Sequence, residues 1–240
     1  MNSAKDIHEV IAIMDRSGSM NGKVGDSVGG FNSTLDVLRS EQDENVDIRV
    51  SVKLFDHEES ILLRSVPLAN VEPLQTSQFI PRGQTALLDA MGNTLTFFME
   101  KKLMNPNAYK HCTIYIVTDG LENASRVYSR DRIKQLVQKA ESTYNIKVIY
   151  LGANQDAIYE AGHLGIPAGQ TMNYSESTQE TQAAYRSAAV MAGRHRSGVP
   201  VEFLPAERTA SQAEPTTPPR VQFNIGQPPP IQRQNPRRGR

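Results

Sequence analysis

The chain lacks the features that mark secreted and membrane-spanning proteins. Its single cysteine, Cys112, cannot form a disulfide within the chain, and residues 1–9 lack the basic-then-apolar order of a secretory signal peptide. No apolar run approaches the roughly 20 residues that a membrane-spanning helix needs. We therefore expect a soluble protein without a membrane partner, in a reducing compartment, most simply the cytoplasm.

The chain also has no excess of positive or negative charge. Lys and Arg together number 26, and so do Asp and Glu, which leaves a formal net charge of zero. A neutral chain creates no overall field that attracts nucleic acid or an anionic membrane. Any contact with nucleic acid would therefore have to come from a local cluster of cations.

The length and composition are sufficient for one folded domain with residues to spare. The 240 residues are 38% hydrophobic, which is enough to bury one sizeable core. We expect this domain at residues 6–197. In residues 198–240 proline is frequent, helical periodicity disappears and arginine outnumbers the acidic residues. Such a composition is typical of an extended, disordered tail.

Strands and helices alternate along the predicted domain. The continuous apolar run Val10–Met14 is typical of a strand that is buried on both faces of a parallel sheet. Apolar and polar residues alternate from Val46 to Leu54, which predicts a strand with one side facing solvent. A polar turn separates this strand from residues 61–66, so the two should pair as an antiparallel hairpin.

The full pattern predicts a three-layer α/β/α Rossmann-like sandwich. Its sheet should be mostly parallel with one antiparallel edge strand. The predicted strands are 8–15, 46–54, 61–66, 113–117, 147–151 and 171–174, and the predicted helices are 24–38, 86–98, 130–144, 156–164 and 178–194.

The loop after the first buried strand carries a pattern typical of metal ligands. Asp15, Ser17 and Ser19 alternate, and Gly18 allows the backbone to turn so that their side chains can meet. Each side chain offers oxygen, and none offers nitrogen or sulfur. Oxygen donors favour a hard cation, with Mg2+ first, Mn2+ as the alternative and Ca2+ ranked below them.

Two distant residues should complete this site. In an open α/β sheet, ligands bind outside the carboxyl ends of the parallel strands. Asp119 ends the second buried strand, and Thr85 starts the helix on the intervening connection. If the two strands are neighbours, Asp15, Ser17, Ser19, Thr85 and Asp119 meet at one edge. Two carboxylates would balance a divalent charge, and three hydroxyls would supply neutral oxygens.

These residues resemble the metal-ion-dependent adhesion site (MIDAS) of the von Willebrand factor type A domain. Five motif positions match in order and in strand context. The resemblance covers about residues 9–196, and its last part looks more like the stand-alone prokaryotic or phage type than the adhesion type. It implies direct coordination of Mg2+ or Mn2+ by Ser17, Ser19 and Thr85, with Asp15 and Asp119 acting mainly through water. It also implies that a partner's carboxylate takes the remaining coordination position.

The resemblance predicts a binding module and not an enzyme. The protein would be a monomer that captures a Glu or Asp side chain of a protein partner in assembly or regulation. A second hypothesis is a nucleic-acid- or scaffold-associated protein that binds through its tail, where Arg237, Arg238 and Arg240 cluster. A third, a metal-assisted hydrolase, requires a general base that no motif supplies.

Two further polar clusters are open to more than one interpretation. The run from Asp56 to Glu59 offers metal-ligating groups, but a charged run at a hairpin turn is more typical of a solvated surface. Glu122 and Asn123 follow Asp119 at the rim of the predicted site. They could shape the choice of partner, or they could cap a helix or a turn.

Overall fold

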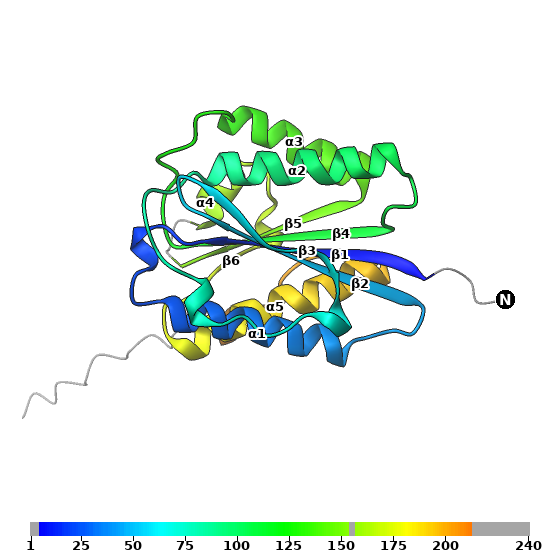
Figure 1. Cartoon of the computed structure of the whole chain (residues 1–240), viewed down its shortest axis with the longest axis horizontal. Helices are drawn as coiled ribbons and strands as arrows, with labels where there is room; N and C mark the ends of the chain where they lie inside the picture. The colour runs from blue at the N-terminus through cyan, green and yellow to red at the C-terminus, as the bar shows by residue number, and fades with distance from the viewer. Residues whose placement is uncertain (1–4, 154–156, 213–240) are drawn as a thin grey trace, which may run out of the picture.

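The computed structural model describes residues 5–153 and 157–212. Its centre is a six-stranded sheet in the order β3-β2-β1-β4-β5-β6 (Figure 1). Neighbouring strands run parallel except β2 and β3, which form an antiparallel hairpin at one edge. The strands span Asp6–Asp15 (β1), Val46–Phe55 (β2), Glu59–Pro67 (β3), His111–Thr118 (β4), Ile146–Gly152 (β5) and Thr171–Asn173 (β6).

Helices cover both faces of this sheet. Figure 1 shows α2 and α3 on one side and α1 and α5 on the other, which confirms the expected three-layer sandwich. No helix of the described residues is both long and apolar enough to cross a membrane. The helices span Val24–Ser40 (α1), Leu87–Met104 (α2), Arg130–Tyr144 (α3), Ala157–His163 (α4), Thr178–Ser197 (α5) and Pro205–Ala210 (α6), with short 3-10 turns at Gly18–Met20, Leu68–Asn70, Thr76–Gln78 and Ala168–Gln170.

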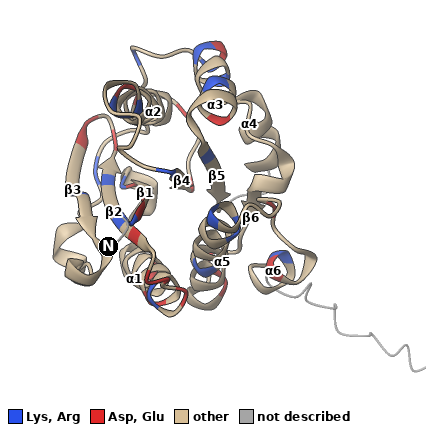
Figure 2. Cartoon of the chain, turned by 90° about the vertical axis from the view of Figure 1, so that its right-hand side faces the viewer, with Lys and Arg blue, Asp and Glu red and all other residues tan. Residues whose placement is uncertain are grey.

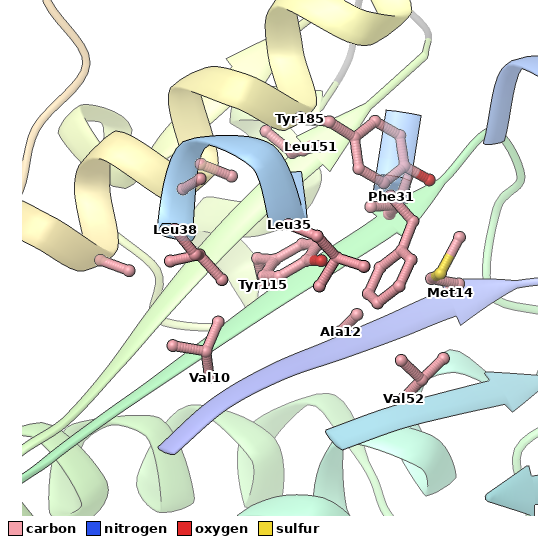
Figure 3. Packing of buried hydrophobic residues seen from close by; sticks show 14 of the residues in the cluster. Val10, Ala12, Met14, Phe31, Leu35, Leu38, Val52, Tyr115, Leu151 and Tyr185 are labelled. Carbon is pink, nitrogen blue, oxygen red and sulfur yellow. The ribbon is translucent and has the colours of Figure 1, made fainter. Parts of the chain in front are cut away.

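Apolar side chains fill the space on both faces of the sheet. On one face, Phe31 and Leu35 of α1 belong to the same buried cluster as Tyr115 of β4 and Tyr185 of α5 (Figure 3). Helices α1 and α5 approach closely at Gly30, where a Cβ atom would lie 2.5 Å from the Tyr185 ring. A second cluster joins α2 and α3 to the other face. Close packing on both faces fixes the strands, and with them the loops that follow.

The second half of β2 differs from its sequence-based prediction. The alternating pattern predicts a solvent-facing side, but Ser51 and Lys53 are only 7% and 9% exposed. Helix α2 lies over this side of the strand. The Lys53 ammonium keeps a charged partner, because its Nζ lies 2.6 Å from Glu59 Oε2. A paired ammonium can be buried at a much lower cost than an unpaired one.

The folded unit extends beyond residue 197, the predicted domain boundary. Residues 205–210 form α6, and Phe203 is buried. Arg194 of α5 donates to both carboxylate oxygens of Glu207, at 2.9 and 2.8 Å. The predicted start of the tail at residue 198 is therefore too early, because this ion pair and the apolar contact hold the segment against α5. Residues 213–240 and the predicted helix start at Asp156 lie outside the described residues.

A hydrogen-bonded network joins α5 to the amino end of the parallel strands. His8 Nε2 lies 3.0 Å from Thr113 Oγ1, which in turn lies 2.9 Å from His195 Nδ1. His195 Nε2 is 3.0 Å from Asn145 Oδ1, and Asn145 Nδ2 is 3.2 Å from His111 Nδ1. The last turn of α5 is therefore tied to β1, to β4 and to the turn before β5.

Candidate metal centre

Three loops meet at the carboxyl end of the central strands. Strands β1 and β4 are paired in parallel, so the residues that follow them emerge side by side. A third loop precedes α2. The structure thereby brings together the five residues of the predicted site, namely Asp15, Ser17, Ser19, Thr85 and Asp119.

Asp15 is buried, and both of its carboxylate oxygens are engaged. Oδ1 accepts a hydrogen bond from Ser17 N at 2.7 Å, and Oδ2 accepts one from Thr118 Oγ1 at 2.6 Å. Burial raises the pKa of Asp15, although these hydrogen bonds act in the opposite direction. Since the loops already engage both oxygens, Asp15 is better placed to orient neighbouring groups or a water than to contact a cation directly.

Ser17, Ser19 and Asp119 form a chain of short contacts. Ser17 Oγ lies 2.9 Å from Ser19 Oγ, and Ser19 Oγ donates to Asp119 Oδ1 at 2.6 Å. With its proton directed at Asp119, Ser19 Oγ accepts from Ser17 Oγ and keeps one lone pair for a cation. The 2.9 Å spacing suits two adjacent ligands of an octahedral Mg2+, which lie about 3.0 Å apart when each bond is about 2.1 Å long.

Thr85 completes the site from the third loop, beside Gly120. A Cβ atom built on Gly120 would lie 3.2 Å from Thr85 Oγ1, 3.4 Å from Ser19 Oγ and 3.8 Å from Asp15 Oδ2. Oxygens from separate loops therefore surround a space that any larger side chain at position 120 would fill. Because all of these donors are oxygens, the residues present fit a hard divalent cation.

Lys23 lies at the same site, and no sequence pattern had indicated it. Its Nζ is 2.5 Å from Asp119 Oδ2 and 2.7 Å from Glu176 Oε1. Burial lowers the pKa of Lys23, but the hydrogen bonds to the two carboxylates outweigh burial, and the net shift is upward. The ammonium therefore stays charged and offsets part of the negative charge that a cation would meet at Asp119.

Solved structures share this architecture. Neither a protein-family model nor a curated protein sequence matches the chain. The von Willebrand factor domain of the type V pili tip protein Mfa5 from Porphyromonas gingivalis aligns over 84% of this chain and 99% of its own, with a TM-score of 0.58 and 10% identity. A von Willebrand factor type A protein from Catenulispora acidiphila aligns over 79% of this chain and 43% of its own, with a TM-score of 0.56 and 14% identity. This chain has the von Willebrand factor type A fold.

A third structure of this fold contains a metal. Proximal thread matrix protein 1 from the mussel byssus, with a zinc-occupied MIDAS motif, aligns over 78% of this chain and 49% of its own, with a TM-score of 0.54 and 15% identity. The chain thus spans less than half the length of the mussel and Catenulispora chains. Identities this low establish the von Willebrand factor type A fold alone, so the metal and the partner must be inferred from this protein's own residues.

Asp56 holds two loops of this candidate site together. Its buried carboxylate pairs with Arg16 and Arg82, and each Nε lies 2.9 Å from Oδ2. Arg82 N also donates to Arg16 O at 2.8 Å. Arg16 precedes Ser17, and Arg82 lies three residues before Thr85. Asp56 therefore fixes the distance between two of the three ligand loops.

The interpretation of the Asp56–Glu59 run as a solvated turn is wrong for Asp56, which is buried. Asp56, His57 and Glu58 do offer ligand atoms within 4.8 Å of one another. However, two guanidinium groups already pair with Asp56, and Arg82 also pairs with Glu58. A cation would have to displace these arginines, so the geometry suits loop positioning better than metal binding.

Glu122 and Asn123 hold the loop after β4 against Thr85 and the start of α2. Asn123 Oδ1 accepts a hydrogen bond from Thr85 N, and Glu122 Oε2 accepts one from Leu88 N, both at 2.9 Å. Of the two roles that the sequence leaves open for these residues, the structure favours capping. The contacts join residues 38 and 34 positions apart, which no local pattern can indicate.

Proposed function

We propose that this protein is a divalent-metal-dependent protein-binding module. The observation that carries this proposal is the convergence of the hydroxyls of Ser17, Ser19 and Thr85 with two carboxylates around the space at Gly120. The solved proteins that share the fold include a matrix protein and a pilus tip protein. Their names support a binding role over a catalytic one.

The proposed ligand set leaves one position for a partner. Ser17, Ser19 and Thr85 would hold the cation directly, and Asp15 and Asp119 would act through water. Mg2+ is the proposed ion, with Mn2+ as the alternative, and when bound it supplies a Lewis-acidic position that attracts an anionic oxygen. A Glu or Asp side chain of a partner protein offers such an oxygen.

The exposed side of the site gives the direction from which a partner would approach. Gly18 and Ser19 are exposed, whereas Asp15, Ser17 and Thr85 are buried. A partner's carboxylate would therefore enter beside Ser19. The ion pair of Lys23 with Glu176 lies next to this entrance, because Lys23 also contacts Asp119.

Metal binding is tested with Mn2+ as a paramagnetic probe. We expect the protein to bind Mn2+ that Mg2+ displaces, followed by electron paramagnetic resonance of the free ion. Asp119→Asn should weaken Mn2+ binding by about tenfold or more. Asp36→Asn is the matched control, because Asp36 lies exposed on α1. Equal Mn2+ affinities of the two variants would contradict the proposed site.

Carboxylate capture is tested by selecting displayed peptides on the immobilised protein, once with Mg2+ and once with EDTA. We expect the peptides recovered with Mg2+ alone to share an Asp or Glu. Replacing that residue by Asn or Gln should abolish binding. Peptides that remain bound at full strength in EDTA would argue against a metal-dependent module.

The tail-based alternative predicts a separable activity. Except for Arg208, the arginines counted for the tail lie in residues 213–240, outside the described residues. Arg208 is part of the fold, where it donates to the carbonyl oxygens of Thr171 and Ala168. If the tail adds nucleic-acid binding, deleting residues 213–240 should remove it and leave Mn2+ binding unchanged.

A further inference from the structure

A cavity lies between the β2–β3 hairpin and α2. Its volume is about 160 Å3, and none of the residues lining it belongs to the predicted metal site. Figure 2 shows the hairpin at one edge of the sheet with α2 beside it. An apolar cavity of about 150 Å3 can bind benzene, so this one has room for a group of similar size.

Large apolar side chains form much of the cavity wall and its mouth. Ile11 of β1 and Phe98 of α2 are buried and line the interior. Ile61 of β3 and Phe97 of α2 line the same cavity but are 45% and 42% exposed. Large apolar side chains left open to solvent around a cavity are typical of a binding site.

Within the described residues, the polar side chains of the wall already have partners, except for Arg64. A molecule inside the cavity would therefore meet few polar groups that need a new hydrogen bond, which favours an apolar occupant. Ser51 Oγ accepts from Ser65 N at 2.8 Å, Lys53 Nζ and Asn93 Nδ2 donate to Glu59 at 2.6 and 2.7 Å, and Thr94 Oγ1 donates to Ala90 O at 2.7 Å.

Arg64 is the exception in this wall. Its guanidinium lies over the Phe97 ring, 5.4 Å from the centroid. Across residues 5–153 and 157–212 it forms no ion pair and no hydrogen bond. Contact with a ring face leaves the N–H groups at the edge of the guanidinium available. Among the described residues of the wall, Arg64 is therefore the cation without a charged partner, and it complements an anionic head group.

A bulge in β3 brings Arg64 to this side of the sheet. Ser65 has a φ of 51°, which is uncommon for a residue other than glycine, and the pairing of β2 with β3 shifts register here. Ser65 Oγ donates to the buried Glu9 at 2.6 Å, which holds the conformation. Successive residues of a regular strand point to opposite faces of the sheet. Here Arg64 contacts Phe97 and Ser65 contacts Glu9, so both side chains lie on the face that α2 covers. Bulges commonly redirect a side chain at functional positions.

We propose that this cavity binds a small carboxylic acid with an aromatic or branched-chain tail. The tail occupies the apolar space, and the carboxylate pairs with the guanidinium of Arg64. A cationic ligand would be repelled by Arg64, and a purely apolar ligand would leave it unpaired. The nearby acid Glu59 does not oppose the carboxylate strongly, because Lys53 pairs with it.

The full chain can be titrated with 3-phenylpropionate and followed by amide chemical shifts. EDTA is present throughout, so that a bound cation cannot capture the acid. We expect saturable shifts confined to the cavity wall, at residues 11, 51–53, 61–65 and 93–98. A ligand of this size should bind with a Kd of about 1 mM. The neutral analogue 3-phenylpropanol should bind more weakly by about tenfold or more, because it cannot form a charge-assisted pair with Arg64.

Two variants separate the role of Arg64 from a general effect of charge. Arg64→Gln should weaken binding of the acid by about tenfold or more and remove the preference for acid over alcohol. Arg64 is exposed, so an unchanged spectrum elsewhere should verify the fold of this variant. Arg49→Gln is the matched control, because Arg49 pairs with Asp47 on β2 and does not line the cavity.

Each contrary outcome overturns the proposal. The absence of saturable shifts in these segments up to about 10 mM acid would exclude the site. Equal binding of acid and alcohol, or full binding by Arg64→Gln, would exclude the assigned ligand class. Shifts confined to residues 15–19 and 119–120 would move the acid to the metal centre instead.

Discussion

The two ends of the central sheet hold their polar side chains in opposite ways. At the carboxyl end, Lys23 keeps its charge between Asp119 and Glu176, beside the exposed Ser19. At the amino end, His8 and His195 are buried in a network of neutral hydrogen bonds. The first arrangement leaves charge and oxygen donors accessible from outside. The second satisfies polar groups internally and joins α5 to the sheet.

One amide determines the direction of the hydrogen bonds in the histidine network. Asn145 Nδ2 donates to Lys110 O at 2.6 Å, so the acceptor Oδ1 faces His195 Nε2. His195 Nε2 therefore carries the proton, and Nδ1 accepts from the hydroxyl of Thr113. The same hydroxyl then accepts from His8 Nε2. This arrangement requires a neutral His195, because an added proton on its Nδ1 would oppose the hydroxyl proton of Thr113.

The surroundings of these histidines disfavour their charged forms. Burial lowers the pKa of His8 well below its usual value, and repulsion from Arg196 and from the protonated forms of His195 and His111 would add to this effect. Burial likewise lowers the pKa of His195 to about 3, with further contributions from His111 and Lys147. His8 and His195 should therefore stay neutral at physiological pH, whereas Lys23 at the carboxyl end stays charged.

The largest expected effect is a loss of Mn2+ affinity that is confined to substitutions at the carboxyl end of the sheet. Asp15→Asn keeps the shape of the side chain but removes its charge and one acceptor, so it should weaken Mn2+ binding by about 100-fold. His195→Gln, at the other end of the sheet, should change Mn2+ affinity by less than about twofold. Mn2+ titration followed by electron paramagnetic resonance measures both values. A comparable loss in the two variants would show that the ends are coupled.

Lowering the pH should reduce the stability that the buried, neutral His195 gives to the fold. An unfolded histidine has a pKa of about 6.5 and His195 in the fold has one of about 3, so the unfolded state takes up the proton first as the pH falls. The contribution of His195 to stability is complete above about pH 6.5 and is lost as the pH falls toward 3. The loss approaches about 1.4 kcal/mol per pH unit.

Urea unfolding between pH 7.5 and pH 5, a range of about two and a half units, measures this loss. In His195→Gln, the slope of the unfolding free energy against pH should be smaller by up to about 1.4 kcal/mol per unit. The carboxylates titrate mostly below this range and are the same in both proteins. Identical slopes would mean that His195 is not held neutral in the fold.

Removing the shared hydroxyl should have an effect of similar or smaller size. Thr113→Val leaves His8 Nε2 and His195 Nδ1 without their common partner in a buried position. We expect a loss of about 1–3 kcal/mol in the free energy of unfolding, measured in urea at neutral pH. Thr143→Val, an exposed threonine of α3, is the control and should cost little. An unchanged stability of Thr113→Val would show that the network contributes nothing to the fold.

The smallest expected effect is a gain in Mn2+ affinity when Lys23 is removed from the carboxyl end. Lys23→Met removes the ammonium that offsets the charge of Asp119, so Mn2+ should bind more tightly by about threefold to tenfold. This gain should shrink in high salt, because salt screens partly exposed charges. Lys139→Met, on the exposed side of α3, should leave Mn2+ affinity unchanged. A weaker affinity in Lys23→Met would mean that Lys23 supports the site and does not compete with the cation.

Local sequence patterns were sufficient to predict most elements of the fold. Helix α3 runs from Arg130 to Tyr144 as predicted, because Ser129 caps its start and Asn145, in the left-handed conformation, ends it. Helix α5 continues three residues beyond the predicted Arg194 and ends before Gly198. Such signals lie within a few residues of the element that they define.

The proposed ligand residues of the candidate site could be predicted from the sequence. The residues that support them could not. The convergence of Asp15, Thr85 and Asp119 follows from the parallel topology, in which neighbouring strands end at one edge. Their binding of a metal stays a prediction. Asp56 supports the ligand loops, and Lys23 offsets the charge of Asp119, through side-chain contacts that form only in the folded protein. Such long-range pairs cannot be recognised from local sequence patterns.

By itself, the sequence determined the order of strands and helices, the oxygen-rich character of the loop after β1 and the mostly parallel sheet. Hydrophobic periodicity, capping residues and glycine positions act over short distances, so they can be recognised before folding is considered. Only the tertiary structure decided that Asp56 joins two ligand loops, that Arg64 faces an apolar cavity and that three histidines meet at the far end. These features depend on long-range contacts, whose energies come from burial and charge in a packed environment that the local sequence does not contain.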